Sequence, residues 1–207
     1  MDIKAMERVM PALQPVARRL GRPLHELLGC VALETGGRFS TSICNAVVPV
    51  DGKMVQRAVE WRDLPAGSRV VAVGLIQWTR VALAEHLRLT GEALSFGTVA
   101  QMTPGEQAEL MTEYFEPHRA RIGRLEDLYL AILYPEAIGK PDGHRVFVSP
   151  SKAYELNRGL DRDRDGDVEV GEICRVVRQW HQRVLERWQP CYDRVPPECP
   201  VREGDGG

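Results

Sequence analysis

Apolar residues recur every three or four positions along most of this 207-residue chain, the spacing of amphipathic helices. These stripes predict helices near residues 3–20, 23–34, 79–89, 104–115, 125–133 and 173–188. Pro11 and Pro15 lie within the first stripe, so we expect a kink or two short helices there. Residues 43–50, 53–61 and 69–73 are instead rich in β-branched side chains, and Asp51-Gly52 is a strong hairpin signal. The pattern therefore predicts an α+β protein, mainly α-helical, with a small antiparallel β insertion at about 43–73 and only helices after it.

Length and composition narrow this picture further. No internal repeat or clear linker divides the chain, so we expect one domain over residues 1–188 and an irregular, Pro- and Gly-rich tail over 189–207. No run of about eighteen apolar residues occurs, which argues against a membrane span. The net charge of −2 does not favour nucleic-acid binding, and none of the five cysteines has the spacing of a zinc or redox motif.

One stretch combines an acidic side chain with a helix end. Glu34 closes the apolar helix pattern and is followed at once by Thr35, Gly36 and Gly37, and either glycine would stop the helix. A helix C-terminus carries partial negative charge and apolar neighbours disfavour ionisation, so both effects should raise the pKa of Glu34. A carboxylic acid protonated near neutral pH is what a glycosidase needs to protonate a leaving sugar oxygen. The alternative is an exposed glutamate before a glycine cap.

A second stretch, residues 161–172, matches the twelve-residue EF-hand loop at its diagnostic positions. Gly166 permits the sharp turn, and Glu169 would act directly or through water. The remaining expected ligands are the side-chain oxygens of Asp161, Asp163, Asp165 and Glu172 and the backbone carbonyl of Asp167. We therefore predict Ca²⁺ in a structural role, because only one such loop is visible and sensors usually pair two. The alternatives are a regulatory calcium switch and a solvated acidic turn.

With these features in place, a family resemblance emerges. The segment Glu34-Thr35-Gly36-Gly37-Arg38-Phe39 resembles the E-S-G-G-x-F motif of soluble lytic transglycosylases and goose-type lysozymes. Gly74-Leu75-Ile76-Gln77 resembles their G-L-M-Q motif, and residues 129–134 and 153–154 look like later tyrosine elements of phage-tail and secreted-effector lysozyme domains. The similarity covers roughly residues 3–180, and some relatives also carry an EF-hand loop.

The resemblance implies a lysozyme-like fold that cleaves the β-1,4 bond between N-acetylmuramic acid and N-acetylglucosamine in peptidoglycan. Glu34 matches the catalytic acid. Gln77 would line the cleft and bind substrate or orient Glu34, although it could instead satisfy its own turn. Tyr134 and Tyr154 are candidate sugar-binding residues, with buried tyrosines whose hydroxyls are satisfied as the alternative.

Two departures from the family pattern bear on the reaction. The transglycosylase A-Y-N-x-G element is not reproduced, since residues 131–136 contain no asparagine, and Thr79 stands where goose-type enzymes tend to have an aspartate. Asp51, Glu60 and Asp63 are candidates for a second carboxylate, but we expect them to face solvent. The missing asparagine favours a lysozyme-type muramidase over a lytic transglycosylase forming 1,6-anhydromuramic products, whereas the absent aspartate leaves no obvious carboxylate to position water. A noncatalytic, calcium-dependent cell-wall-binding module is the alternative of another class.

The expected partner is the glycan strand of peptidoglycan. Because the first residues lack the uninterrupted apolar segment of a secretory signal, we expect action in the periplasm or at the cell wall after delivery by other means. Delivery machinery and an immunity protein would then be further partners, as for an antibacterial effector, and the chain could be a domain of a larger secreted effector or phage protein.

Overall fold

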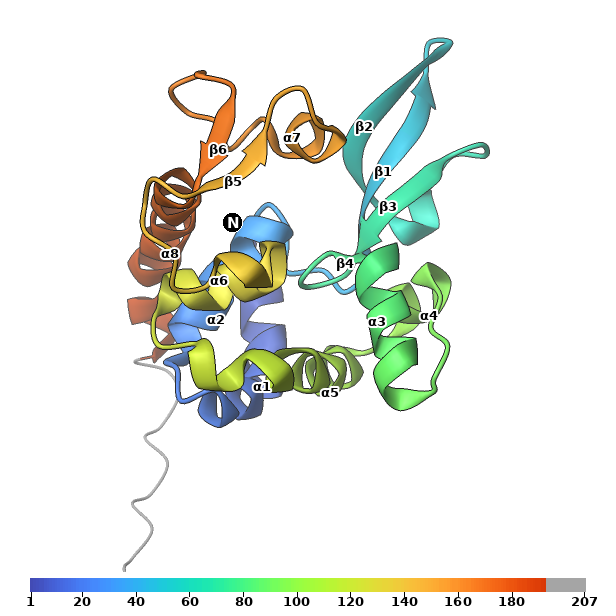
Figure 1. Ribbon diagram of the computed structural model, residues 1–207. Helices are drawn as coiled ribbons and strands as arrows, with labels where there is room; N and C mark the ends of the chain where they lie inside the picture. The colour runs from blue at the N-terminus through green and yellow to red at the C-terminus, as the bar shows by residue number, and fades with distance from the viewer. Residues whose placement is uncertain (193–207) are drawn as a thin grey trace, which may run out of the picture.

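A computed structural model describes residues 1–192 of the chain and shows an α+β architecture dominated by helices (Figure 1). The α-helices are α1 (Ile3–Arg19), α2 (Leu24–Glu34), α3 (Arg80–Thr90), α4 (Phe96–Gln101), α5 (Pro104–Phe115), α6 (Leu125–Leu133), α7 (Lys152–Asn157) and α8 (Val170–Tyr192). Short 3₁₀ turns lie at η1 (Trp61–Asp63), η2 (Glu116–Arg121) and η3 (Pro135–Ala137). The strands are β1 (Ile43–Val50), β2 (Lys53–Glu60), β3 (Arg69–Val73), β4 (Trp78–Thr79), β5 (Arg145–Val148) and β6 (Asp167–Glu169). The predicted fold class, mainly α-helical with a small antiparallel sheet, is confirmed.

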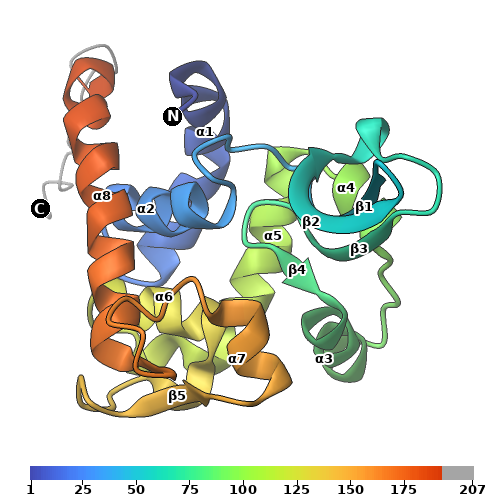
Figure 2. The same cartoon turned by 90° about the horizontal axis from the view of Figure 1, so that it is seen from above.

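Helix α2 lies at the centre of the helical part. It packs against α1, α6 and α8, and Figure 2 shows α8 running beside it. Its residues are almost all buried, which explains why its sequence is apolar on every side. Helix α1 continues through Pro11 and Pro15 instead of dividing into two short helices, because its buried stripe packs against α2 and α5. In the part of the chain that the structure describes, no helix is both long and apolar enough to cross a membrane.

The β insertion forms a four-stranded antiparallel sheet in the order β2-β1-β3-β4. Strands β1 to β3 occupy the segments that the sequence predicted, and Asp51-Gly52 makes the hairpin turn. Asn45 of β1 lies opposite Ala58 of β2 on one side and Ala72 of β3 on the other. The sheet stands beside the helical part in both views, so that a face of the sheet and the end of α2 border a common space (Figures 1 and 2).

Two expectations about the second half of the chain were wrong. After the first sheet the chain is not purely helical, because β5 pairs antiparallel with β6. Strand β5 is four residues long, and β6, which lies inside the acidic loop, is three residues long. Both are too short to show a readable alternation of apolar and polar residues. Helix α8 also continues through residues 189–192, where an irregular tail was expected. The rest of the predicted tail, residues 193–207, lies outside the described residues.

Candidate active site

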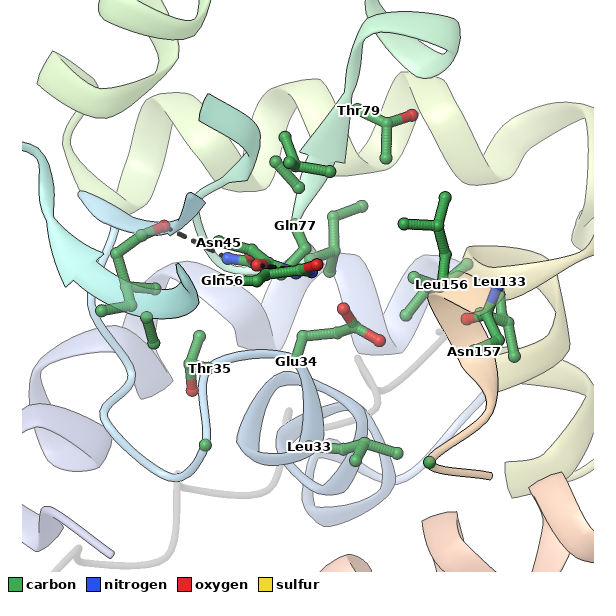
Figure 3. A pocket seen from close by; sticks show the side chains of 18 of the residues that line it. Leu33, Glu34, Thr35, Asn45, Gln56, Gln77, Thr79, Leu133, Leu156 and Asn157 are labelled. Carbon is green, nitrogen blue, oxygen red and sulfur yellow. Dashed lines mark hydrogen bonds between the residues drawn. The ribbon is translucent and has the colours of Figure 1, made fainter. Parts of the chain in front are cut away.

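A cleft of about 820 Å³ separates the helical part from the sheet (Figure 3). One wall is the C-terminal end of α2 with residues of α6, and the other is the face of β1, β2 and β3 together with the segment that leads into β4. A third side is formed by α7 and the residues that follow it, from Glu155 to Leu160. Segments far apart in the sequence therefore meet around one open cleft, of a volume typical of ligand-binding sites.

Glu34 is the last residue of α2, and its carboxyl group points into this cleft (Figure 3). The helix stops there because the next residues turn back on it, with the amide of Gly37 donating to the carbonyl of Ala32 at 2.7 Å. Gly37 has φ +75°, and a Cβ at this position would lie 3.3 Å from both Met1 and the Trp180 ring. The two glycines that the sequence singled out therefore allow a tight turn that leaves Glu34 at the edge of the cleft.

The surroundings of Glu34 keep its carboxyl group from ionising easily. Burial among protein atoms raises its pKa from 4.5 to about 7, and a hydrogen bond from the Tyr129 hydroxyl opposes this rise. The side chain retains some exposure where it meets the cleft, so a substrate can reach it. The sequence predicted a raised pKa, and burial is its leading cause. A substantial fraction of Glu34 is therefore protonated at neutral pH.

Tyr129 of α6 begins the 129–134 segment that the resemblance picked out, but it was not among the predicted site residues. It also falls on the apolar stripe of residues 125–133, and it is 4% exposed in the structure. Burial and the nearby Glu34 carboxylate raise the pKa of Tyr129 well above its usual value, so its phenol stays protonated and donates to Glu34. The signal available in the sequence was that a buried tyrosine hydroxyl requires an acceptor.

The segment Gly74–Gln77 borders the cleft opposite α2, and one buried side chain holds it. Gln107 of α5 is fully buried, and its Oε1 accepts from the amide of Leu75 at 2.9 Å. Its Nε2 donates to the carbonyls of Thr41 and Val99, both at 2.8 Å. Gly74 has φ +88°, and a Cβ there would lie 2.7 Å from Gln107 Oε1, which explains the glycine.

Gln77 lines the cleft, as the resemblance implied, but its side chain also satisfies the turn. Its Nε2 donates to the carbonyls of Gly74 at 2.9 Å and Ile43 at 3.2 Å, and its backbone has φ +52°. Gln77 therefore satisfies its own turn while it borders the cleft. With Nε2 engaged by the turn, the carbonyl oxygen of the side chain is the atom left to contact a ligand.

Neither Tyr134 nor Tyr154 is among the residues that line the cleft. Tyr134 is 37% exposed and packs edge-on against Phe147 of β5, with ring centroids 5.8 Å apart. Tyr154 of α7 donates its hydroxyl to Oδ2 of Asp161 at 2.7 Å, so it contacts the acidic loop instead. The sequence could not separate these positions because both tyrosines lie close along the chain to segments that do border the cleft.

The carboxylates considered as a second catalytic group also lie elsewhere. Asp51 is exposed at the hairpin tip, Asp63 pairs with Arg62 at 3.8 Å, and Glu60 accepts hydrogen bonds from two serine hydroxyls. None of the three is among the residues that line the cleft. Among the described residues, the cleft contains one carboxylate besides Glu34, that of Glu155 on α7.

The acidic loop brings carboxylates together next to the third side of the cleft. Asp161, Asp163 and Asp165 each offer an oxygen within 4.8 Å of the others. Glu172 is 2% exposed and accepts from the backbone amides of Arg162 at 2.6 Å and Glu169 at 3.0 Å, so its carboxylate lies over the loop. The side chain of Asp167 pairs with Arg145 at 2.9 Å, consistent with a ligand role for its backbone carbonyl alone. An all-oxygen donor set of this kind suits Ca²⁺ better than a softer transition metal.

No protein-family model, curated protein or solved structure matches this chain. The chemistry of the cleft therefore has to be inferred from its own side chains. These are a partly protonated carboxyl group on one wall and hydrogen-bonding amide side chains on the other, an arrangement suited to acid-assisted cleavage of a polar, extended substrate.

Proposed function

We propose that this protein is a lysozyme-like glycosidase that cleaves the β-1,4 bond between N-acetylmuramic acid and N-acetylglucosamine in peptidoglycan. The observation that carries the proposal is Glu34, whose pKa is raised to about 7 at the edge of an open cleft. Its motif and that of Gly74–Gln77 lie in two separate segments that border the same cleft, as the family resemblance requires. The protein would act in the periplasm or at the cell wall after delivery, with an immunity protein as a further partner in producing cells.

In this proposal Glu34 is the general acid. Its proton passes to the glycosidic oxygen as the bond to the sugar breaks and an oxocarbenium-like sugar develops. A carboxyl group with a pKa near the working pH is protonated often enough to donate, and its conjugate base is stable enough to accept a proton in a later step. Tyr129 fixes the carboxyl group through its hydrogen bond and stabilises the carboxylate that remains.

The second half of the reaction admits two candidates. The missing helix asparagine favours a muramidase, in which water attacks the sugar. In a muramidase, Glu155 would be the group to activate that water, since among the described residues that line the cleft it is the carboxylate besides Glu34. In a lytic transglycosylase the muramic acid hydroxyl attacks instead, and no second carboxylate is needed. Mass spectrometry of released fragments separates the two reactions, since hydrolysis gives reducing muramic ends and transglycosylation gives 1,6-anhydro ends.

The test of the proposed activity is clearing of purified peptidoglycan by wild-type protein and by Glu34→Gln. Glutamine keeps the size of the side chain and can still accept from Tyr129, but it has no proton to donate. Glu109→Gln, at an exposed glutamate of α5, is the matched control for loss of one carboxylate. We expect clearing by wild type and by the control, and a loss of at least a hundredfold in Glu34→Gln. Absence of clearing by wild type would favour a noncatalytic cell-wall-binding module.

We further propose that residues 161–172 bind Ca²⁺ through the side chains of Asp161, Asp163, Asp165 and Glu172 and the carbonyl of Asp167. The fit of the donor set supports this assignment, since three aspartates lie together with a buried glutamate beside them. A cation would offset the mutual repulsion of these carboxylates. The role would be structural, because Asp161 directly follows the Glu155–Leu160 side of the cleft and Glu172 lies in the first turn of α8.

A further inference from the structure

Two amide side chains on the sheet face the cleft and are hydrogen-bonded to each other. Gln56 of β2 donates its Nε2 to Oδ1 of Asn45 on β1 at 3.0 Å, and both residues line the cleft. Figure 3 shows the two side chains close together beside Gln77, above Glu34 in the view. The pair therefore lies where a sugar bound at Glu34 would pass.

The hydrogen bond leaves a defined donor and acceptor unused. Among the described residues, neither Nδ2 of Asn45 nor Oε1 of Gln56 has a hydrogen-bond partner. If both amide groups were rotated end for end, the pair would still retain one free N–H group and one free carbonyl oxygen. Because each amide restrains the other, less side-chain entropy is lost when a ligand binds than for two independent side chains.

Two alanines flank Asn45 on the sheet. Asn45 lies directly opposite Ala58 on β2 and Ala72 on β3, and both alanines line the cleft. Side chains opposite each other in a sheet point to the same face, so Asn45 stands between two methyl groups. This face of the sheet therefore presents a donor, an acceptor and small apolar groups side by side.

We propose that the Asn45–Gln56 pair recognises the 2-acetamido group of the sugar bound beside Glu34. An acetamido group consists of a carbonyl oxygen, an N–H group and a methyl group. Asn45 Nδ2 donates to its carbonyl oxygen, Gln56 Oε1 accepts from its N–H group, and its methyl group packs on Ala58, which lies opposite Asn45 and two residues along β2 from Gln56. This assignment rests on the proposed glycosidase function and adds the determinant by which the cleft selects N-acetylated sugars. Glycan strands that have lost their acetyl groups are then poor substrates.

Binding of neutral oligosaccharides tests the assignment apart from catalysis. The Glu34→Gln protein is titrated by calorimetry with tetra-N-acetylchitotetraose and with cellotetraose, which carries a hydroxyl in place of each acetamido group. We expect binding of the acetylated sugar to be the stronger by at least tenfold. Adding Asn45→Ala or Gln56→Ala should weaken binding of the acetylated sugar roughly tenfold each and leave binding of cellotetraose unchanged. Gln101→Ala, at an exposed amide at the end of α4, is the matched control and should change neither titration.

The outcomes distinguish failure of acetamido recognition from failure of the glycosidase function. Equal binding of both sugars, or equal weakening of both by the Asn45 and Gln56 substitutions, overturns acetamido recognition. Unchanged melting temperatures of the variants would exclude loss of the sheet as the cause of weakening. Suppose that wild type clears peptidoglycan, and that Asn45→Ala and Gln56→Ala each clear both acetylated and de-N-acetylated peptidoglycan as well as wild type does. Acetamido recognition then fails, and the glycosidase function stands. If wild type neither clears peptidoglycan nor binds the acetylated sugar, the function itself fails.

Discussion

Replacing Glu34 by glutamine should remove the proposed activity and at the same time stabilise the protein at alkaline pH. The folded state holds the Glu34 proton more tightly than the unfolded chain, since burial raises the pKa from 4.5 to about 7. The free energy of unfolding of wild type therefore falls as the pH rises from about 4.5 to about 7 and stays lower above that range. Glutamine is neutral at every pH and does not show this loss.

The size of this stability difference follows from the rise in the pKa of Glu34. A difference of about 2.5 pKa units corresponds to about 3 kcal/mol between fully protonated and fully ionised Glu34. Because cleft water reaches part of the side chain, we expect about 2 kcal/mol in the measured difference. Glu34→Gln should thus be more stable than wild type by about 2 kcal/mol at pH 8, and the gap should nearly vanish at pH 4.5.

Urea denaturation at pH 4.5, 6, 7 and 8, followed by circular dichroism, measures this gap, with Glu109→Gln as the control for loss of one carboxylate. The pH profile of kcat/KM provides the functional counterpart, because activity should decline as Glu34 ionises near pH 7. A stability difference between wild type and Glu34→Gln that is the same at all four pH values would refute the raised pKa, and with it the reason for assigning Glu34 as the acid.

Three further predictions concern the support of this site. Tyr129→Phe removes the hydrogen bond that lowers the pKa of Glu34, so the alkaline limb of the kcat/KM profile should move to higher pH; an unmoved limb would show that the bond has no effect. Gly74→Ala places a methyl group 2.7 Å from Gln107 Oε1 at φ +88°, and should lower the free energy of unfolding in urea by about 1–3 kcal/mol, whereas a neutral result would contradict the tight approach. Chelation with EGTA should lower the melting temperature of wild type, and Glu172→Ala should abolish this response; a wild-type melting curve insensitive to EGTA would count against a structural Ca²⁺ site.

The local features of the fold were readable from the sequence. The end of α2 at Glu34 and the hairpin at Asp51-Gly52 both depend on residues within a few positions of one another, and both are present in the structure. The raised pKa of Glu34 was also predictable, because the residues that precede it on α2, from Leu27 to Leu33, are all apolar or small and leave it few polar neighbours.

The parts that escaped prediction depend on contacts between distant segments. Tyr129 approaches Glu34 from α6, and Gln107 reaches Thr41 across a separation of 66 residues. Asn45 and Gln56 were recognisable as strand residues, but their role depends on which face of the sheet borders the cleft. Tyr134 and Tyr154 were misjudged for the same reason, since closeness in the chain to a cleft segment does not fix the direction of a side chain.

The buried amide of Gln107 has a mechanical consequence for the molecule. Through three hydrogen bonds it joins α5 to the segments before β1 and after β3 and to α4. The wall opposite Glu34 is thus anchored from behind by a fully buried side chain that does not line the cleft. We therefore expect a substitution at Gln107 to displace that wall without removing any group that a ligand could contact.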